Sequence, residues 1–322
     1  MSGLPSLYVT RPLPDAVLEA ARVHFDVTVR GKTLPMSGAE TTVALVGFDA
    51  VLPTLGDALG AGAFGGEIRC KMLGNFGVGY NHIDVAAAKN AGVVVSNTPG
   101  AVTDATADIA VLLMLMTARR ASVGEAAVRD GSWGGWHPTQ FLGLHVSGKT
   151  LGIIGMGRIG KAIAKRCHFG FGMDVVFYNR SKVADCGVPN ARQLHSVLEV
   201  MAGADVVFLS VPGGAANQHM IGAAELAAMR PHGILVNTAR GEVVDEAALI
   251  AALKSGSIGG AGLDVYENEP KVPEALRRLE NVSLLPHLGT AALEVRVGMG
   301  LMAVDNLRAF FAGETVPNEV TA

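Results

Sequence analysis

The chain reads Leu151-Gly-Ile-Ile-Gly-Met-Gly-Arg-Ile-Gly160 near its middle, which predicts a short buried strand, a tight glycine turn and the first turn of a helix. Gly155, Gly157 and Gly160 fit the pattern G-x-G-x-x-G. In that pattern the first glycine permits the turn, the second lets the backbone approach a pyrophosphate, and the third lets helix and strand pack closely. The helix start adds unpaired N–H groups and a positive dipole end, which favour anions. We therefore predict a dinucleotide site here, with a purely structural turn as the alternative.

From residue 150 onward the sequence alternates apolar strands with helices, which is typical of a doubly wound parallel sheet. The predicted strands cover residues 151–154, 174–178, 206–210, 234–237, 260–264 and 282–285. They predict a six-stranded Rossmann sheet made of two mononucleotide-binding halves. A long helix over residues 291–311 would then return to the first domain.

The first part of the chain alternates strands and helices in the same way. The predicted strands are 7–9, 25–29, 42–46, 71–75 and 93–95, and the predicted helices are 14–24 and 83–91. Because 322 residues exceed the usual size of one core, we expect two α/β domains, each with a doubly wound parallel sheet. Asn97-Thr98-Pro99-Gly100 breaks the alternation and predicts a crossing between domains. The predicted domains are residues 1–98 plus 288–322 and a larger Rossmann dinucleotide-binding domain of residues 99–287.

Charge and composition exclude several classes of protein. A net charge of −3 gives no indication of a nucleic-acid partner. The three cysteines, Cys70, Cys167 and Cys186, are odd in number and lack C-x-x-C spacing, so we expect a reduced compartment, no disulfide and no metal site. The longest apolar run, residues 109–116, is too short to span a bilayer, and the N-terminus lacks the pattern of a signal peptide. We therefore expect a soluble cytoplasmic protein without a membrane partner.

The segment between the two alternating parts contains both tryptophans of the chain. Residues 103–120 have helical periodicity and are apolar on most faces, which indicates a core helix. Trp133 and Trp136 follow among glycines, just before Pro138. A core position for both fits this pattern. An excursion that packs on another subunit fits it equally, since aromatic residues are favoured at interfaces.

The turn after the second predicted Rossmann strand indicates which nicotinamide cofactor is used. A carboxylate here selects NAD by accepting from the ribose 2′-OH, whereas a neutral residue beside an arginine admits the 2′-phosphate of NADP. The turn reads Asn179-Arg180-Ser181-Lys182. Arg180 can form a bidentate, charge-assisted pair with the phosphate, and Ser181 can donate its hydroxyl. We predict NADP(H), with NAD(H) as the weaker alternative; a solvated surface turn would explain the same residues.

Five motifs taken together resemble the D-isomer-specific 2-hydroxyacid dehydrogenase family. They are Gly77-Val-Gly-Tyr-Asn-His-Ile-Asp84, Gly155-Met-Gly-Arg-Ile-Gly160, Asn237-Thr-Ala-Arg-Gly241, Gly262-Leu-Asp-Val-Tyr-Glu-Asn-Glu-Pro270 and Leu285-Pro-His-Leu-Gly-Thr290. The resemblance runs from Lys71 to the C-terminus. The Asn179-Arg180-Ser181 turn and the Trp133-x-x-Trp136-x-Pro138 segment are most similar to the glyoxylate/hydroxypyruvate reductases. The resemblance implies that the smaller domain binds substrate and that the protein is a homodimer with residues 101–147 as its dimerisation arm.

The catalytic arginine, glutamate and histidine of that family would fall on Arg240, Glu269 and His287. Elementary chemistry agrees, because reduction of a 2-oxo acid needs a cation for the carboxylate and a proton donor for the carbonyl oxygen. Arg240 and His287 each follow the predicted end of a strand, where open α/β sheets bind ligands. Glu269 would hydrogen-bond the imidazole and fix its tautomer. Glu267 is a rival for that role, and a purely local contact at a helix start is the alternative for Arg240.

The resemblance also implies binding residues outside this trio. The backbone N–H groups of Val78 and Gly79 would bind the substrate carboxylate, although a plain structural turn would also explain the glycines there. Trp136 would reach the active site of the neighbouring subunit. Gly213-Gly214 departs from the family pattern and should loosen the cofactor loop. The cofactor would contact Thr106, Gly155, Gly157, Arg158, Ile159, Gly160, Asn179, Arg180, Ser181, Val211, Pro212, Thr238, Asp264, His287 and Gly289.

These observations predict NADPH-dependent reduction of glyoxylate and hydroxypyruvate to glycolate and D-glycerate, with His287 as the general acid. One alternative is a related dehydrogenase that acts on a different 2-oxo acid. Another is a non-catalytic, NADP-sensing corepressor on the same scaffold, against which the complete set of Arg240, Glu269 and His287 argues. A phosphorylated substrate would need basic groups that Gly47-Phe48-Asp49 does not offer.

Overall fold

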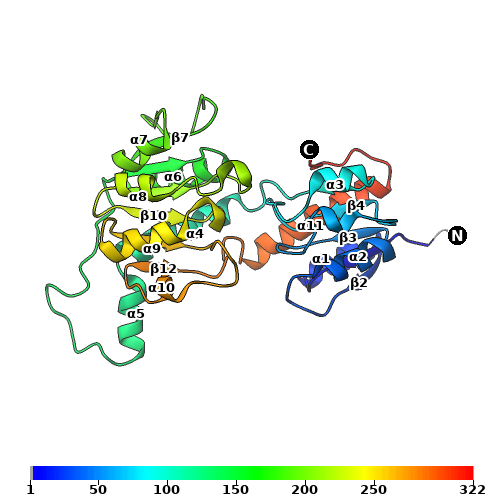
Figure 1. The fold of residues 1–322 in the computed structure, drawn as a ribbon, viewed down its shortest axis with the longest axis horizontal. Coiled ribbons are helices and arrows are strands. Elements are labelled where there is room, and N and C mark those ends of the chain that lie inside the picture. The colour runs from blue at the N-terminus through cyan, green and yellow to red at the C-terminus, as the bar shows by residue number, and fades with distance from the viewer. Residues whose placement is uncertain (1–2, 322) are drawn as a thin grey trace. The chain divides into compact units, whose positions relative to one another are not determined.

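The structure, a computed structural model, describes residues 3–321. The chain divides into two compact units, each with one parallel sheet covered by helices (Figure 1). Unit 1 contains the described residues up to Val102 and from Ala291 onward, and unit 2 is Thr103–Thr290. The predicted fold class, α/β with two parallel sheets, is confirmed.

Unit 1 is built on a five-stranded parallel sheet with the strand order β2-β1-β3-β4-β5. Its strands are β1 (Ser6–Val9), β2 (Asp26–Val29), β3 (Ala50–Leu52), β4 (Met72–Gly74) and β5 (Val94–Ser96). Its helices are α1 (Asp15–Arg22), α2 (Gly38–Gly47), α3 (Val85–Asn90) and α11 (Leu293–Phe311), with a 3-10 turn η1 (Ala61–Phe64). Gly74 lets α11 lie directly on β4, because a Cβ at this position would stand 2.8 Å from Leu307 Cγ.

One predicted strand of unit 1 is wrong. Residues 42–46 lie in helix α2, and the third strand is β3, which begins after that helix. Ser37 caps the helix, because its hydroxyl accepts from the Glu40 N–H while the Glu40 carboxylate accepts from the Ser37 N–H. This capping box is the signal of a helix start that the β-branched residues after it obscure. The buried residues of α2, at positions i, i+3 and i+4, lie on one face of the helix: Thr41, Ala44 and Leu45.

Unit 2 is built on a seven-stranded parallel sheet with the strand order β12-β11-β10-β9-β6-β7-β8. The strands are β6 (Thr150–Ile154), β7 (Asp174–Tyr178), β8 (Arg192–Gln193), β9 (Val206–Leu209), β10 (Ile234–Asn237), β11 (Gly260–Leu263) and β12 (Val282–Leu284). Each of the six predicted strands agrees with an observed one to within a residue at either end. The predicted count of six is one short, because the two polar residues of β8 are too few to show a strand pattern.

Helices cover both faces of the unit 2 sheet (Figure 1). On one face lie α4 (Thr103–Ala118) and α6 (Arg158–Phe171), and on the other lie α7 (Val197–Gly203), α8 (Ala223–Ala228), α9 (Glu246–Ser255) and α10 (Glu274–Arg277). Val207 and Phe208, adjacent in β9, are fully buried in opposite cores. Burial of such a side chain contributes roughly 1.5–3 kcal/mol. The two cores therefore fix the strands and, with them, the loops at the edge of the sheet.

Helix α5 (Ala121–Arg129) differs from the other α-helices of unit 2, since it has no buried residue. Together with the segment that follows it, α5 projects away from the sheet of unit 2 (Figure 1). Within residues 3–321, no helix combines the length and the hydropathy that a membrane span requires. Cys70, Cys167 and Cys186 are buried and free, and burial raises the pKa of Cys70 and of Cys167 to about 12.

Candidate active site

The glycine turn after β6 lies where the strand order reverses in the sheet of unit 2. β6 pairs with β7 on one side and with β9 on the other, and open α/β sheets bind ligands at the carboxyl ends of the strands at such a point. Gly155 has a φ of +97°, and a Cβ there would lie 2.5 Å from the Ser210 carbonyl oxygen. A Cβ on Gly160 would lie 2.3 Å from the Gly155 carbonyl oxygen. Both positions therefore require glycine, and the helix start packs directly on the turn.

The N-terminus of α6 fits the phosphate groups of a dinucleotide. Gly157 is the N-cap residue and provides no side-chain cap, and Arg158 and Ile159 open the helix. A Cβ on Gly157 would have no neighbour within 4 Å, so the approach to the first turn is open. The N–H groups of an uncapped first turn and the helix dipole attract negative charge.

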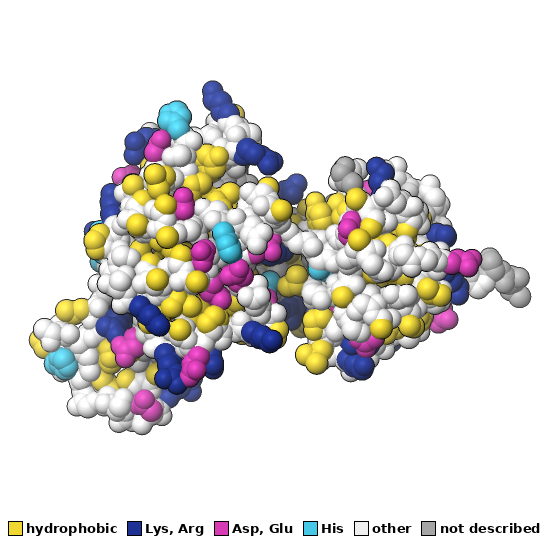
Figure 2. Space-filling view, in the orientation of Figure 1, with side chains coloured by type: hydrophobic (Ala, Val, Ile, Leu, Met, Phe, Trp, Pro, Cys, Tyr) yellow, Lys and Arg dark blue, Asp and Glu magenta, His cyan; other side chains and the backbone are white. Residues whose placement is uncertain are grey.

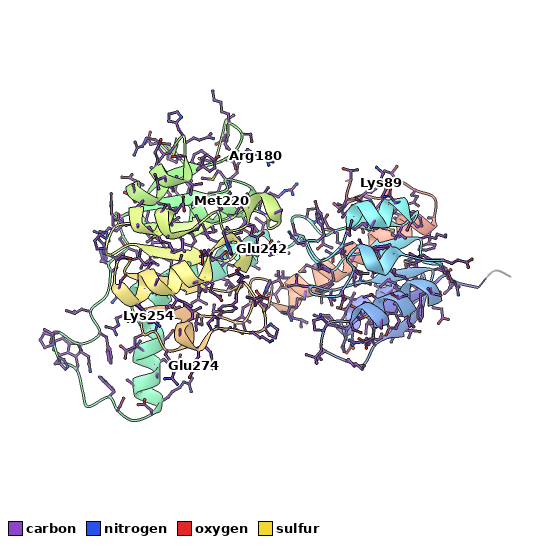
Figure 3. All side chains as sticks on the ribbon, in the orientation of Figure 1. Lys89, Arg180, Met220, Glu242, Lys254 and Glu274 are labelled. Carbon is purple, nitrogen blue, oxygen red and sulfur yellow. The ribbon has the colours of Figure 1, made fainter. Side chains whose placement is uncertain are left out.

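The loop after β7 is folded by two side-chain amides. Asn179 Oδ1 accepts from the Met156 N–H at 3.1 Å, which joins this loop to the glycine turn. Its Nδ2 donates to the carbonyl oxygen and the hydroxyl of Ser181, at 3.0 and 3.2 Å. From β8, Gln193 Nε2 donates to the carbonyl oxygens of Asn179 and Ser181, each at 3.0 Å. Arg180 lies exposed in this ordered loop (Figure 3).

Asp264, at the end of β11, shapes the turn that carries His287. Its Oδ1 accepts from the Leu288 N–H at 2.6 Å and its Oδ2 from the Gly289 N–H at 2.8 Å. The His287 N–H donates to the Asp264 carbonyl oxygen at 2.9 Å, and Thr106 Oγ1 donates to the Gly289 carbonyl oxygen at 3.3 Å. Burial raises the pKa of Asp264, although the N–H donors oppose the shift. The structure thus gives Asp264 contacts to the His287 turn that the sequence did not predict.

His287 and Glu269 are in contact. His287 Nδ1 lies 2.9 Å from Glu269 Oε2, and each side chain is about one-third exposed, at 32% and 33%. Glu269 Oε1 also accepts from the Tyr266 N–H at 3.1 Å. Burial alone would raise the pKa of Glu269, but the hydrogen bond with His287 and the charges of His287 and Arg240 outweigh it, so this pKa lies below its usual value. With Nδ1 facing a carboxylate, Nε2 is the nitrogen that can face a ligand.

Glu267, the rival of Glu269, contacts a different histidine. His219 Nε2 lies 2.7 Å from Glu267 Oε1, so one loop carries two glutamates that each hold one imidazole. Figure 2 shows acidic and histidine side chains together on this face of unit 2. The hydrogen bond to Glu267 raises the pKa of His219 above its usual value. Of the two glutamates, only Glu269 contacts the histidine that follows β12.

Arg240 follows β10 and begins the 3-10 turn η3 (Gly241–Val243). Asn237 folds this turn, because its Oδ1 accepts from the Ala239 N–H and its Nδ2 donates to the Arg240 carbonyl oxygen, each at 3.0 Å. Thr238 lies inside the same turn. Burial lowers the pKa of Arg240 against the opposing charges of Glu269 and Glu242, and a guanidinium stays charged at any physiological pH.

Gly241 brings the loops of Arg240 and Glu269 together. A Cβ on Gly241 would lie 1.9 Å from the carbonyl carbon of Tyr266 and 2.3 Å from the Glu267 nitrogen. Only glycine allows this approach of two backbones, which sets the spacing of the two charged side chains.

Two hydrogen bonds hold the segment after β9 that contains Gly213 and Gly214. Asn217 Nδ2 donates to the Pro212 carbonyl oxygen at 2.9 Å, next to Val211. The Gly214 N–H donates to the Glu242 carboxylate. Figure 3 labels Glu242, which ties this segment to the turn of Arg240.

Comparison with known proteins identifies the family. The sequence model for the NAD-binding domain of D-isomer specific 2-hydroxyacid dehydrogenases matches residues 111–289. The glyoxylate reductase of Thermococcus gammatolerans is 41% identical over 320 residues, which cover 98% of this chain and 96% of the relative. The chain belongs to the D-isomer-specific 2-hydroxyacid dehydrogenase family.

Solved structures agree with this assignment. The NADPH-dependent glyoxylate/hydroxypyruvate reductase of Sinorhizobium meliloti, solved with NADP and malonate, is 35% identical, with a TM-score of 0.88 over 99% of this chain and 97% of its own. A glyoxylate reductase from Paecilomyes thermophila is 34% identical, with a TM-score of 0.84 over 99% of each chain. This D-2-hydroxyacid dehydrogenase is therefore an oxidoreductase that binds a nicotinamide dinucleotide and acts on a small molecule.

In unit 1 of the dehydrogenase, Val78 and Gly79 lie in the loop after β4. Gly77, which begins this loop, has a φ of +153°. The carbonyl oxygens of the loop accept hydrogen bonds from side chains of the same unit. Trp136 lies in the segment after α5 and is 80% exposed.

Two contributors to the site of this dehydrogenase were not predicted: Gln193 and Gly241. Gln193 lies in β8 and acts through its contacts with the loop after β7, and no local pattern reports such contacts. The sequence indicated Gly241 in one way only, by its position directly after Arg240 in the motif Asn237-Thr-Ala-Arg-Gly241.

Proposed function

We propose that this dehydrogenase reduces glyoxylate and hydroxypyruvate to glycolate and D-glycerate with NADPH. The observation that carries the proposal is the His287–Glu269 pair near the charge of Arg240, at the carboxyl edge of the nucleotide-binding sheet. The choice of substrate is supported by relatives named glyoxylate reductase, at 41% identity in the case of Thermococcus gammatolerans.

Each residue of the trio has a distinct task in this proposal. Bound NADPH supplies the hydride that reduces the carbonyl carbon. Arg240 holds the carboxylate and the carbonyl oxygen with its planar guanidinium and so orients the carbonyl. Protonated His287 donates from Nε2 to the carbonyl oxygen as that oxygen gains negative charge. Glu269, kept ionised by its lowered pKa, accepts from Nδ1 and stabilises the imidazolium until it donates.

In unit 1, the backbone N–H groups of Val78 and Gly79 bind the substrate carboxylate in this proposal. Glycine on either side of Val78 suits a loop whose backbone must come close to a ligand.

A panel of 2-oxo acids assayed with NADPH and with NADH tests the proposed function. We expect the highest kcat/KM for glyoxylate and hydroxypyruvate with NADPH. A bulkier 2-oxo acid as the best substrate would overturn the substrate assignment. If no 2-oxo acid promotes oxidation of either cofactor, the protein is not the proposed reductase, and the NADP-sensing corepressor becomes the better account.

Arg180→Ala tests the preference for NADPH. Arg180 is exposed in a loop that Asn179 and Gln193 hold in place, and the turn of residues 179–182 contains no carboxylate that would repel the 2′-phosphate. Hydrogen bonds to charged groups are worth about 1.5–3 kcal/mol, and exposure favours the lower end of that range, so we expect KM for NADPH to rise about tenfold. KM for NADH should stay unchanged.

Arg192→Ala is the matched control, because Arg192 is an exposed arginine of the neighbouring strand β8. It should leave both KM values as they are. Equal effects of Arg180→Ala on NADPH and NADH would show that Arg180 does not read the 2′-phosphate.

We further propose that the dehydrogenase is a homodimer with residues 101–147 as the dimerisation arm, through which Trp136 reaches the second active site. Helix α5 has no buried residue, and the arm exposes Val128, Trp133, Trp136 and Leu142. Exposed apolar side chains in one segment are typical of subunit interfaces. Light scattering should give twice the chain mass of 33.2 kDa, and the mass of a single chain would contradict the proposal.

A further inference from the structure

Two asparagine side chains hold the loop of unit 1 that contains Val78 and Gly79. Asn75 is fully buried, and its Nδ2 donates to the carbonyl oxygens of Gly77, at 2.9 Å, and Gly79, at 3.1 Å. Asn97 Nδ2 donates to the Val78 carbonyl oxygen at 2.9 Å. Successive carbonyl oxygens of the loop are therefore all bound to side-chain amides of unit 1.

The directions of the loop's N–H groups follow from the planar trans peptide bond. In such a bond the carbonyl oxygen and the N–H of the next residue point in opposite directions. The Gly77 oxygen faces Asn75, so the Val78 N–H points away from Asn75. The Val78 oxygen faces Asn97, so the Gly79 N–H points away from Asn97. Successive N–H groups favour the binding of an anion when the carbonyl oxygens of the same peptide bonds point to the opposite side.

The backbone around Asn97 is itself fixed. Its N–H donates to the Asn318 carbonyl oxygen at 3.1 Å, and its carbonyl oxygen accepts from Asn306 Nδ2 at 3.0 Å. Asn306, fully buried in α11, accepts in turn from Asn318 Nδ2 at 3.1 Å. The Thr98 N–H gives the Gly77 oxygen a second donor at 3.1 Å. The Asn97 side chain therefore projects from a backbone that the C-terminal part of unit 1 holds in place.

We propose that Asn75 and Asn97 are positioning residues that preorganise the N–H groups of Val78 and Gly79 for the substrate carboxylate. The inference rests on the proposed function, in which those N–H groups bind that carboxylate. Donors that are already oriented need no rearrangement when the anion binds, so they stabilise it more than mobile amides do. Both asparagines must be neutral amides, since an aspartate of the same shape cannot donate and would repel the carbonyl oxygens of the loop.

Asn97→Asp and Asn75→Asp test this inference, with Asn281→Asp as the matched control. Asn281 makes the same kind of contact in unit 2, from its Nδ2 to the Leu253 carbonyl oxygen. The readouts are KM for glyoxylate, calorimetric affinity of the NADPH complex for oxamate, an unreactive isostere of glyoxylate, and Kd for NADPH. In both test variants we expect KM for glyoxylate to rise and the affinity for oxamate to fall, each about tenfold or more. Kd for NADPH should stay unchanged. The control should change none of the three.

Folded test variants with the KM and oxamate affinity of the wild type would overturn the inference. Equal losses of affinity for oxamate and NADPH would also overturn it, because general structural damage gives that pattern. A wild type that does not reduce glyoxylate would overturn the proposed function instead, and the oxamate affinities would still decide the role of the two asparagines.

A measurement on the wild type tests the inference even if the asparagine variants do not fold. In the NADPH complex, addition of oxamate should shift the amide protons of Val78 and Gly79 downfield. The side-chain amide protons of Asn75 and Asn97 should exchange slowly with and without oxamate. Unchanged Val78 and Gly79 amides, or rapid exchange of the two side-chain amides, would overturn the inference.

Discussion

Replacing His287 with alanine is expected to lower kcat for glyoxylate reduction by about 10²–10⁴-fold, the usual contribution of a positioned general acid. The hydride can reach the carbonyl carbon readily only if the oxygen receives a proton as its charge grows. His287 is the imidazole that Glu269 holds by Nδ1, at 2.9 Å, which leaves Nε2 for the substrate. The loss should fall on kcat, measured by NADPH oxidation at saturating glyoxylate.

His219→Ala is the matched control for this prediction. His219 also has a positive φ, also pairs with a glutamate of the same loop, and also lies near the surface of unit 2. It differs from His287 in its place in the sheet, because His219 lies in the chain after β9, whereas His287 follows β12. Its imidazole contacts Glu267 instead of Glu269. We expect kcat of this variant to remain within a factor of a few. If the two variants lost the same activity, the histidine after β12 would have no special part in proton donation.

Replacing Arg240 with glutamine is expected to lower kcat/KM for glyoxylate by about 10²–10³-fold, the usual cost of removing a donor to a developing oxyanion. Glutamine keeps a hydrogen-bonding group but loses the positive charge and the planar pair of donors. The partial burial that lowers the pKa of Arg240 also strengthens its attraction for the substrate anion. Steady-state kinetics with glyoxylate should show KM rising together with the fall in kcat.

Arg240→Lys separates charge from geometry. Lysine keeps the charge without the bidentate fork, so this variant should recover only part of the activity that glutamine loses. Arg230→Gln, which removes an arginine paired with Asp205 in the same unit, should leave KM for glyoxylate unchanged if the variant folds. A KM for glyoxylate unaffected by Arg240→Gln would show that Arg240 makes only a local contact at the start of η3.

The sheet of unit 2 could be predicted from the sequence because its strands are buried on both faces. Such strands are short apolar runs that end at or just before a glycine or polar residue, as β9 does before Ser210 and β10 does at Asn237. The two failures have a common cause, since the period of a pattern cannot be read from a few residues. Residues 42–46 are rich in β-branched side chains yet continue a helix that Ser37 starts, and β8 is only two residues long.

The site could be predicted only in part, for a related reason. The motifs predicted Arg240, Glu269 and His287 as a set, and the structure brings Glu269 and His287 into contact. The contacts that arrange this set join loops after different strands, so they depend on the strand order. The hydrogen bonds from two N–H groups of the His287 turn to the Asp264 carboxylate are of this kind. The close approach of the Gly241 and Tyr266 backbones is another.

Transfer of deuterium from NADPH labelled at C4 of the nicotinamide to glyoxylate tests the central claim most directly. The account predicts that the wild type forms one glycolate for each NADPH consumed, with the deuterium on the carbon that bears the new hydroxyl. It also predicts that His287→Ala gives the same labelled product at a far lower rate. Oxidation of NADPH without labelled glycolate, or no glyoxylate-dependent oxidation at all, would contradict the account.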